Sequence, residues 1–278
     1  MSALLTVTRL TVHEAARKRI LTATLIGAAA FLVLYAIGFH FMAQRVAQEA
    51  GPSVMRQRLL LNFLALAGLY ATHFLTLMTA VLLPVDTLSG EISSGVVQTL
   101  ASKPIHRSTV VLGKWLAFSL VAVGYLLVVA GGVLVISRLI GGMTPPGLTV
   151  GLPLMALEAV VFVTLSISGG ARLSTVTNGV LVFGLYGIAF IGGWVEQIGT
   201  MAGNVPAQNV GTIASLLMPT EALWQRAAWH MQPSIMRDLQ MTPFSPASLP
   251  SPAMVWWAFG YTGLALVAGI QSFRRRAL

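Results

Sequence analysis

The stretch DTLSGEISSGVVQTLASKPIHRSTVVLGKW, residues 86–115, separates two long apolar runs of the sequence. The runs before and after it, residues 59–85 and 115–137, contain no Asp, Glu, Lys or Arg. A helix of about 20 apolar residues crosses the roughly 30 Å of hydrocarbon in a bilayer. We therefore expect two membrane-spanning helices to flank this polar stretch, which lies outside the hydrocarbon.

The composition of the whole chain is that of a membrane protein. Of its 278 residues, 56% are hydrophobic and only 9% are charged, whereas about 25% are charged in a typical soluble domain. The net charge of +9 comes from basic residues beside the apolar runs, so it indicates membrane-flanking segments and no nucleic-acid partner. The absence of cysteine excludes disulfides, thiolate metal sites and a cysteine nucleophile.

Six apolar windows predict an all-α, polytopic membrane protein with a single membrane domain over residues 1–278. The predicted spans are residues 20–44, 59–85, 115–137, 148–170, 179–195 and 253–273. The first follows Arg17-Lys18-Arg19, as a signal peptide would. Its apolar run is longer than that of a signal peptide and no small-residue cleavage site follows, so we predict a retained anchor.

Residues 1–19 predict a helix that lies at the membrane interface. Its apolar and basic residues fall loosely on different sides, with Leu4, Val7, Leu10 and Ala15 on one and Arg9, His13 and Arg17 on another. A frayed tail is the alternative structure for this segment.

The distribution of basic residues predicts the orientation in the bilayer. If the N-terminus is inside, the inner segments hold 11 Lys and Arg in 61 residues, and the outer segments hold 6 in 83. Cytoplasmic segments are enriched in Lys and Arg. We therefore predict that both termini and residues 86–114 are cytoplasmic.

The outer loop, residues 196–253, contains seven prolines. A short helix can form between Pro219 and Pro233, before the last span. The methionines of this loop are potential Cu(I) ligands, but their spacing is irregular and methionine is an ordinary apolar filler. We therefore predict no metal site.

The polar stretch itself predicts a short amphipathic helix over residues 87–102. Ser89 can cap its N-terminus, Glu91 suits the positive end of the helix dipole, and Pro104 follows the helix. Its apolar face repeats at four-residue intervals, with Ile92, Val96 and Leu100. A helix this short needs a surface to pack on, in its own chain or in another protein.

Motifs of nucleotide-binding and catalytic sites are absent from the sequence. It has no G-x-x-x-x-G-K-[ST] loop, no metal-ligand spacing among its five histidines and no G-x-S-x-G elbow. We predict that the chain is not an enzyme.

Three polar residues inside the predicted spans form a candidate intramembrane polar site. Glu158 predicts either a proton or cation pathway or a pairing with a neighbouring helix, because an acid in a span is costly. His73 and Asn62, both in the second span, are predicted to form hydrogen bonds between helices.

Residues of the polar stretch resemble the signature between the second and third spans of type-2 ABC exporter permeases. The resemblance rests on Gly90-Glu91, on Ser94-Gly95 and on LASKPIHRSTVVLGK at residues 100–114. The predicted order of elements along the whole chain is similar to that family as well. Within the family, the sequence is most similar to the branch associated with multicopper-enzyme maturation, which includes the nitrous oxide reductase maturation permease.

The resemblance implies that residues 87–102 form a coupling helix, which docks in a cleft of a separate ATP-binding subunit. The implied interface residues are Glu91 as a polar contact, Ile92, Val96 and Leu100 as apolar packing, and Pro104 and Arg107 in the loop that follows. Arg107 is expected to orient this loop at the membrane surface. Other members of the family carry more acids beside Glu91, where this sequence has Ser93 and Ser94.

The resemblance also implies the partners and the location. The expected assembly in the plasma (inner) membrane is a pair of permease chains, identical rather than different, with an ABC ATPase subunit on each. ATP and Mg²⁺ bind to the ATPase, this chain carries no cofactor, and transport is expected to be export. The alternatives are an ion-coupled secondary transporter or channel component that uses Glu158, and a membrane scaffold for enzyme maturation.

Overall fold

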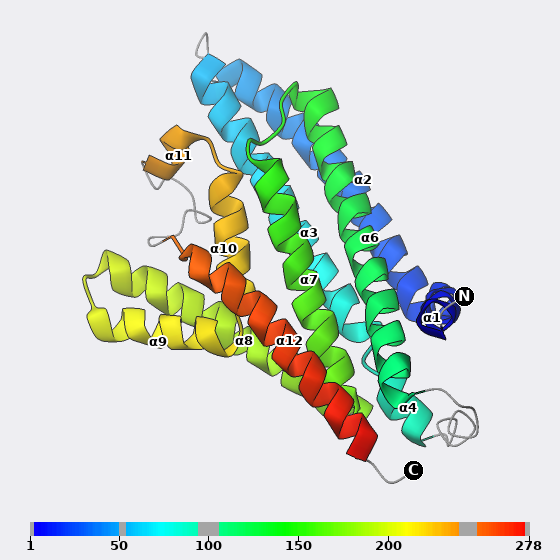
Figure 1. The fold of residues 1–278 in the computed structure, drawn as a ribbon. Coiled ribbons are helices and arrows are strands. Elements are labelled where there is room, and N and C mark those ends of the chain that lie inside the picture. Colours follow the sequence, from blue (N-terminus) through cyan, green and yellow to red (C-terminus); the bar gives the residue numbers. More distant parts are fainter. Residues whose placement is uncertain (1–2, 50–53, 94–105, 239–248, 276–278) are drawn as a thin grey trace.

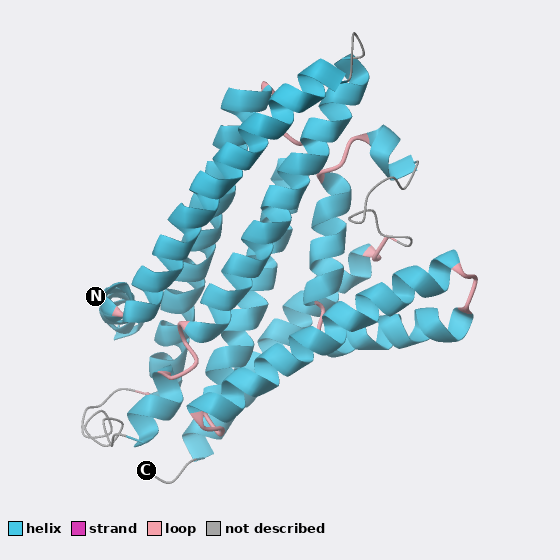
Figure 2. Cartoon of the chain, turned by 180° about the vertical axis from the view of Figure 1, so that it is seen from behind, coloured by secondary structure: helices cyan, strands magenta, loops and turns pink. Residues whose placement is uncertain are grey.

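The structure is a computed structural model that describes residues 3–49, 54–93, 106–238 and 249–275. All regular structure in these residues is helical (Figures 1 and 2). The helices are α1 (Ala3–Arg17), α2 (Arg19–Glu49), α3 (Val54–Leu82), α4 (Thr87–Ser93), α6 (Arg107–Gly141), α7 (Leu148–Gly170), α8 (Thr175–Met201), α9 (Val205–Leu217), α10 (Thr220–His230), α11 (Ser234–Asp238) and α12 (Pro252–Arg275).

Six of these helices are long and apolar enough to cross a membrane, namely α2, α3, α6, α7, α8 and α12. The predicted all-α fold with six spans and short helices before the last span is confirmed. Helices suit a bilayer because they satisfy their backbone hydrogen bonds internally. Some helices extend past the uncharged windows: α6 begins at Arg107 and includes Lys114 and Arg138. A charge does not mark the end of a helix, because Lys114 is paired with Glu91 and long basic side chains can reach the interface from within a helix.

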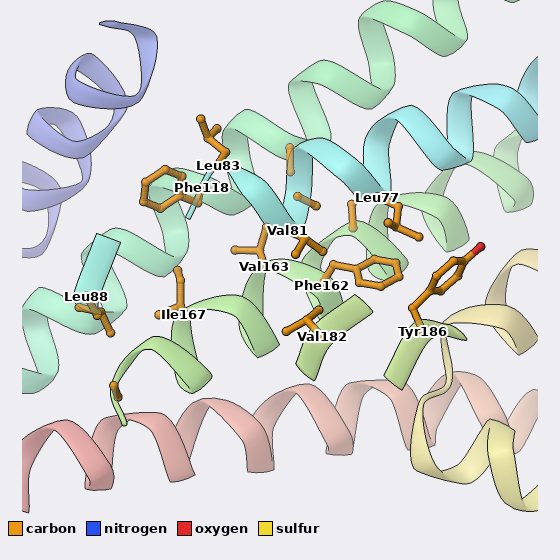
Figure 3. Packing of buried hydrophobic residues seen from close by; sticks show 14 of the residues in the cluster. Leu77, Val81, Leu83, Leu88, Phe118, Phe162, Val163, Ile167, Val182 and Tyr186 are labelled. Carbon is orange, nitrogen blue, oxygen red and sulfur yellow. The ribbon is translucent and has the colours of Figure 1, made fainter. Parts of the chain in front are cut away.

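Helix α7 lies at the centre of the bundle. It packs against α3, α6, α8, α10 and α12, and it is the most buried of the six spans. Helices α2 and α12 lie at the periphery, with mainly exposed side chains. The apolar core therefore forms around α7, and Figure 3 shows side chains such as Leu77 of α3, Phe162 of α7 and Val182 of α8 converging there.

Helix α1 packs against α6 near one end of the bundle. The contact is close, because a Cβ atom added at Gly113 would lie 2.6 Å from Val7 Cγ1. The buried residues of α1 are Thr8, Thr11 and Ala15, whereas Leu10 is 65% exposed. Small side chains therefore form the packed side of α1, and Leu10 points away from α6.

Helices α9 and α10 fold back on the spans. Gly192 of α8 lies against Ala214 of α9, and a Cβ atom there would be 2.3 Å from the Ala214 Cβ. Figures 1 and 2 show α9 beside the far part of α8, to one side of the bundle. Helix α10 packs mainly on the central span α7 and also contacts α8. The predicted outer loop thus brings one helix, α10, against the central span.

The contact between α7 and α12 requires a glycine. A Cβ atom added at Gly269 would lie 2.9 Å from the Ser168 Cα, whereas one added at Gly263 of the same helix would meet nothing within 4 Å. We expect Gly269→Ala to push α12 away from α7 and to lower the free energy of unfolding by about 1–3 kcal/mol. Gly263→Ala is the matched control. Thermal unfolding in detergent checks this, and equal midpoints for both variants would contradict the close contact.

Candidate functional site

A pair of buried polar side chains joins α3 and α7 inside the bundle. His73 Nδ1 lies 2.9 Å from Glu158 Oε2, and the two side chains are 1% and 3% exposed. His73 Nε2 lies 3.3 Å from the Tyr186 hydroxyl oxygen on α8. The imidazole ring therefore connects three membrane spans through both of its nitrogens. The sequence marked His73 and Glu158, but not Tyr186.

Aromatic rings enclose this histidine. The Trp224 ring of α10 stacks on the His73 ring with centroids 5.0 Å apart, and the Tyr70 ring of α3 lies nearly parallel to it at 5.9 Å. The Tyr70 and Trp224 rings also contact each other, with centroids 5.2 Å apart, and together they shield the imidazole from water. Helix α10 thereby becomes a fourth wall of the polar site, although it is not a membrane span.

A second buried acid, Glu221, lies one turn before Trp224 on α10. It is 6% exposed, and the Gln225 Nε2 donates to its Oε1 over 3.4 Å. Burial, with the field of Glu158, raises the pKa of Glu221 to about 7 against the opposing effects of His73 and Gln225. Glu221 fits against α8 only because residue 193 is glycine. A Cβ atom added at Gly193 would lie 2.8 Å from the Glu221 Cγ.

Asn62 does not join this cluster. It precedes His73 by three turns of α3, or roughly 16 Å. Its amide is buried, and neither its oxygen nor its nitrogen has a hydrogen-bond partner among the described residues. Of the three polar residues predicted together, the structure brings together His73 and Glu158 only.

The second candidate site lies at the end of the bundle where α3 leads into α4. Helix α3 ends before Pro84, and α4 begins with hydrogen bonds from the Thr87 N–H to the Pro84 carbonyl, 3.0 Å, and from the Gly90 N–H to the Asp86 carbonyl, 2.7 Å. Ser89 is therefore not the N-cap, and that prediction is wrong. The Ser89 hydroxyl instead lies 2.8 Å from the Thr175 Oγ1 in the first turn of α8.

An ion pair joins the start of α4 to the junction between α1 and α2. The Lys18 Nζ lies 2.7 Å from Asp86 Oδ1 and 3.4 Å from Thr87 Oγ1. A partly exposed ion pair contributes little stability on its own. The pair instead positions α4, because the Lys18 side chain joins the α1–α2 junction to the turn after α3 and to the first residue of α4.

The other end of α4 is joined to α6. Glu91 forms an ion pair with Lys114, whose side chain is only 5% exposed. A buried ammonium group needs such a counter-charge, because a lone buried ion is costly. Glu91, expected to contact a partner protein, therefore contacts its own chain here.

The remaining residues of the predicted docking set divide into two groups. Ile92 is half-buried against the core, and the Arg107 Nη1 donates to the Arg274 carbonyl at the end of α12 over 3.3 Å. Val96, Leu100 and Pro104 lie outside the described residues.

A buried amide that the sequence did not single out completes this end. The Asn178 Nδ2 of α8 donates to the Ser166 carbonyl of α7 over 2.6 Å, and the Ser166 hydroxyl donates to the Val81 carbonyl of α3 over 2.9 Å. The ends of α3, α7 and α8 are thus joined next to α4. We define the residues that join α4 to its neighbours, Lys18, Asp86, Ser89, Glu91, Lys114 and Thr175, as the α4 frame.

Comparison with known proteins identifies the family. The family described as ABC-2 family transporter protein matches residues 14–278. The chain belongs to the ABC-2 transporter family. A search of curated proteins finds no match.

This ABC-2 chain is a permease subunit, the multi-pass membrane component of an ABC transporter. Such subunits lack a nucleotide-binding domain, their family has no cofactor, and they work with ATPase subunits. The predicted function is therefore confirmed in these terms. An ion-coupled secondary transporter, the alternative raised by Glu158, does not fit membership of this family.

The buried pair of this permease predicts a characteristic mutational pattern. We expect His73→Leu to lower the free energy of unfolding by about 3–5 kcal/mol, because it leaves Glu158 buried without its partner. Adding Glu158→Leu should restore part of that loss, since the pair is then replaced by apolar groups. Denaturant unfolding of the purified chain measures both variants. His40→Leu, at an exposed histidine of α2, is the control with a small effect.

The single variant Glu158→Leu completes the comparison. If the double variant loses as much free energy of unfolding as His73→Leu and Glu158→Leu lose together, a direct His73–Glu158 interaction is contradicted.

Proposed function

We propose that α4 and the residues that follow it are the element through which a separate ATPase subunit moves this permease. The observation that carries the proposal is the α4 frame. Through Lys18, Thr175 and Lys114, side chains of α4 and the turn before it contact the α1–α2 junction, α8 and α6. A displacement of α4 would therefore be transmitted to three other parts of the bundle at once.

Fewer residues of α4 are available to contact the ATPase than the sequence predicted. Thr87 and Leu88 are buried, and Glu91 and Ile92 face their own chain. Ser93, the last described residue before position 106, is exposed. We assign docking to Ser93 and to the later residues of the predicted set, Val96, Leu100 and Pro104. Glu91 acts in positioning, because its ion pair with Lys114 holds α4.

Basic residues support a cytoplasmic location for this end. The described Lys and Arg residues at this end are Arg9, Arg17, Lys18, Arg19, Arg107, Lys114, Arg172, Arg274 and Arg275. Among the other described basic residues, Arg45, Arg56, Arg58 and Arg138 lie at the opposite ends of α2, α3 and α6, and Arg226 and Arg237 lie in α10 and α11. The positive-inside tendency favours the cytoplasm for the more basic end. ATP is available there, so the proposed orientation places α4 where an ATPase can reach it.

The proposed assembly contains two copies of this chain in the inner membrane, with one ATPase on each. ATP closes the ATPases on each other, the α4 helices move with them, and the membrane halves switch between inward- and outward-favouring states. Exposed apolar side chains along α8, such as Val180 and Ile191, are available for lipid or for the second copy. Export as the direction, and the multicopper-enzyme maturation branch, follow the resemblance of residues 86–114 and stay predictions.

A paired substitution tests the docking role of α4. We expect Ser93→Arg with Val96→Asp to abolish attachment of the ATPase while leaving the chain folded, because both changes add charge to the proposed docking surface. Ser89→Ala, on the side of α4 that contacts α8, should retain the ATPase. The measurement is affinity purification of the tagged chain in mild detergent, with the bound ATPase quantified by mass spectrometry. Normal attachment in the double variant would refute the docking assignment.

A further inference from the structure

The buried polar cluster contains more acid than base. Glu158 of α7 and Glu221 of α10 are both carboxylic acids, and His73 of α3 is the one basic group whose ion pair within the cluster is described. The other titratable side chains that face it are Tyr70 and Tyr186, which are uncharged near neutral pH. Helix α6 contributes Leu126, an apolar side chain.

Charge balance sets how many protons this cluster holds. With both carboxylates ionised and the imidazole protonated, the cluster carries one net negative charge away from water. Burying an unbalanced charge is costly, and such groups take up protons instead. One further proton, on Glu221 beside the His73–Glu158 ion pair, makes the three groups neutral together.

We propose that His73, Glu158 and Glu221 form a proton-binding site that holds two protons while α10 is packed on α3 and α7, and releases one when that contact opens to water. The site is separate from the α4 frame, so the inference does not rest on the docking role of α4.

A small cavity beside the ion pair supports a proton site with one water. The cavity has a volume of about 10 Å³ and is lined by His73, Thr76, Glu158 and apolar side chains. Glu158 Oε1 and Thr76 Oγ1 are both buried and have no hydrogen-bond partner among the described residues. About 10–15 Å³ accommodates a single water when polar partners are present. One water between these two oxygens would satisfy both and would give a proton a path to the carboxylate.

The same geometry favours a proton over a metal ion. In the described part of the chain, no group of three or more His, Cys, Asp or Glu residues could hold a metal. Ca²⁺ takes about 6–8 oxygen ligands, and Mg²⁺ usually retains several waters. A cavity the size of one water has no room for such a shell.

Proton binding would act on the contact of α10 with the spans. Trp224 and Glu221 of α10 meet α3 and α8 at this site, so a second ionised carboxylate on α10 would repel Glu158 of α7. Repulsion between buried like charges favours separation or hydration of the groups. A change in protonation therefore biases whether α10 stays packed, in a permease whose helices must move during transport.

Infrared spectroscopy of the intact chain in detergent measures the bound proton directly. We expect a carbonyl band of a protonated carboxylic acid at about pH 6, where exposed acids are ionised, and loss of that band as the pH rises through about 7. Glu14→Gln, at an exposed acid of α1, should keep the band, and Glu221→Gln should lose it. Absence of the band from the unsubstituted protein at about pH 6 would overturn the proposal, and so would its persistence in Glu221→Gln.

The pH dependence of stability provides a second readout. Because the folded protein raises the pKa of Glu221 from 4.5 to about 7, the folded state binds more protons than the unfolded state within this window. Stability should therefore fall as the pH rises from 4.5 to about 7. We expect the unfolding midpoint to fall less steeply in Glu221→Gln than in the unsubstituted protein, while Glu14→Gln matches the unsubstituted protein. Equal slopes in the unsubstituted protein and Glu221→Gln would contradict the proposal, even if their infrared spectra differed.

Discussion

The hydrocarbon of a bilayer offers no hydrogen-bond partner, and this constraint determines where the protein can place polar groups. Long helices pair their own backbone, and the core around α7 is mostly apolar. Charged side chains that remain inside must find partners in the same chain, as His73 does with Glu158 and Lys114 with Glu91. Polar contacts are consequently concentrated in two places, the buried cluster and the α4 frame, and both join several helices.

The number and type of the membrane spans could be predicted from the sequence, because hydrocarbon length and hydropathy decide them. Their ends could not, since α6 continues through Lys114. His73 and Glu158 were recognisable singly as costly residues, but their contact joins positions 85 residues apart. Glu221 was missed because it lies in a polar, proline-rich segment, and its burial comes from the packing of α10 on α7 and α8. The inward-facing side of α4 likewise depends on contacts made by Lys18 and Lys114.

The α4 frame and the buried cluster differ in how easily their contacts can be broken, which fits the proposal that the ATPase moves the permease at α4. Within the α4 frame, the Lys18–Asp86 ion pair and the Ser89–Thr175 contact are partly exposed and can exchange with water at low cost. The buried cluster is shielded from bulk solvent, and its partners can separate only if the charges are neutralised or hydrated. A push on α4 would reach the cluster along α8, which contributes Thr175 to the α4 frame and Tyr186 to the cluster. On the proposed docking role of α4, the permease would receive the motion of the ATPase at the α4 frame, and the buried cluster would resist separation of the helices.

The measurement that tests this account most directly is cross-linking from single cysteines in the complex with its ATPase. The chain has no cysteine of its own, so Ser93→Cys introduces a unique reactive site at the end of α4. The account predicts a short-range cross-link from residue 93 to the ATPase subunit and none from Thr212→Cys, an exposed position on α9. A complex that contains the ATPase but cross-links from position 212 and not from position 93 would contradict it.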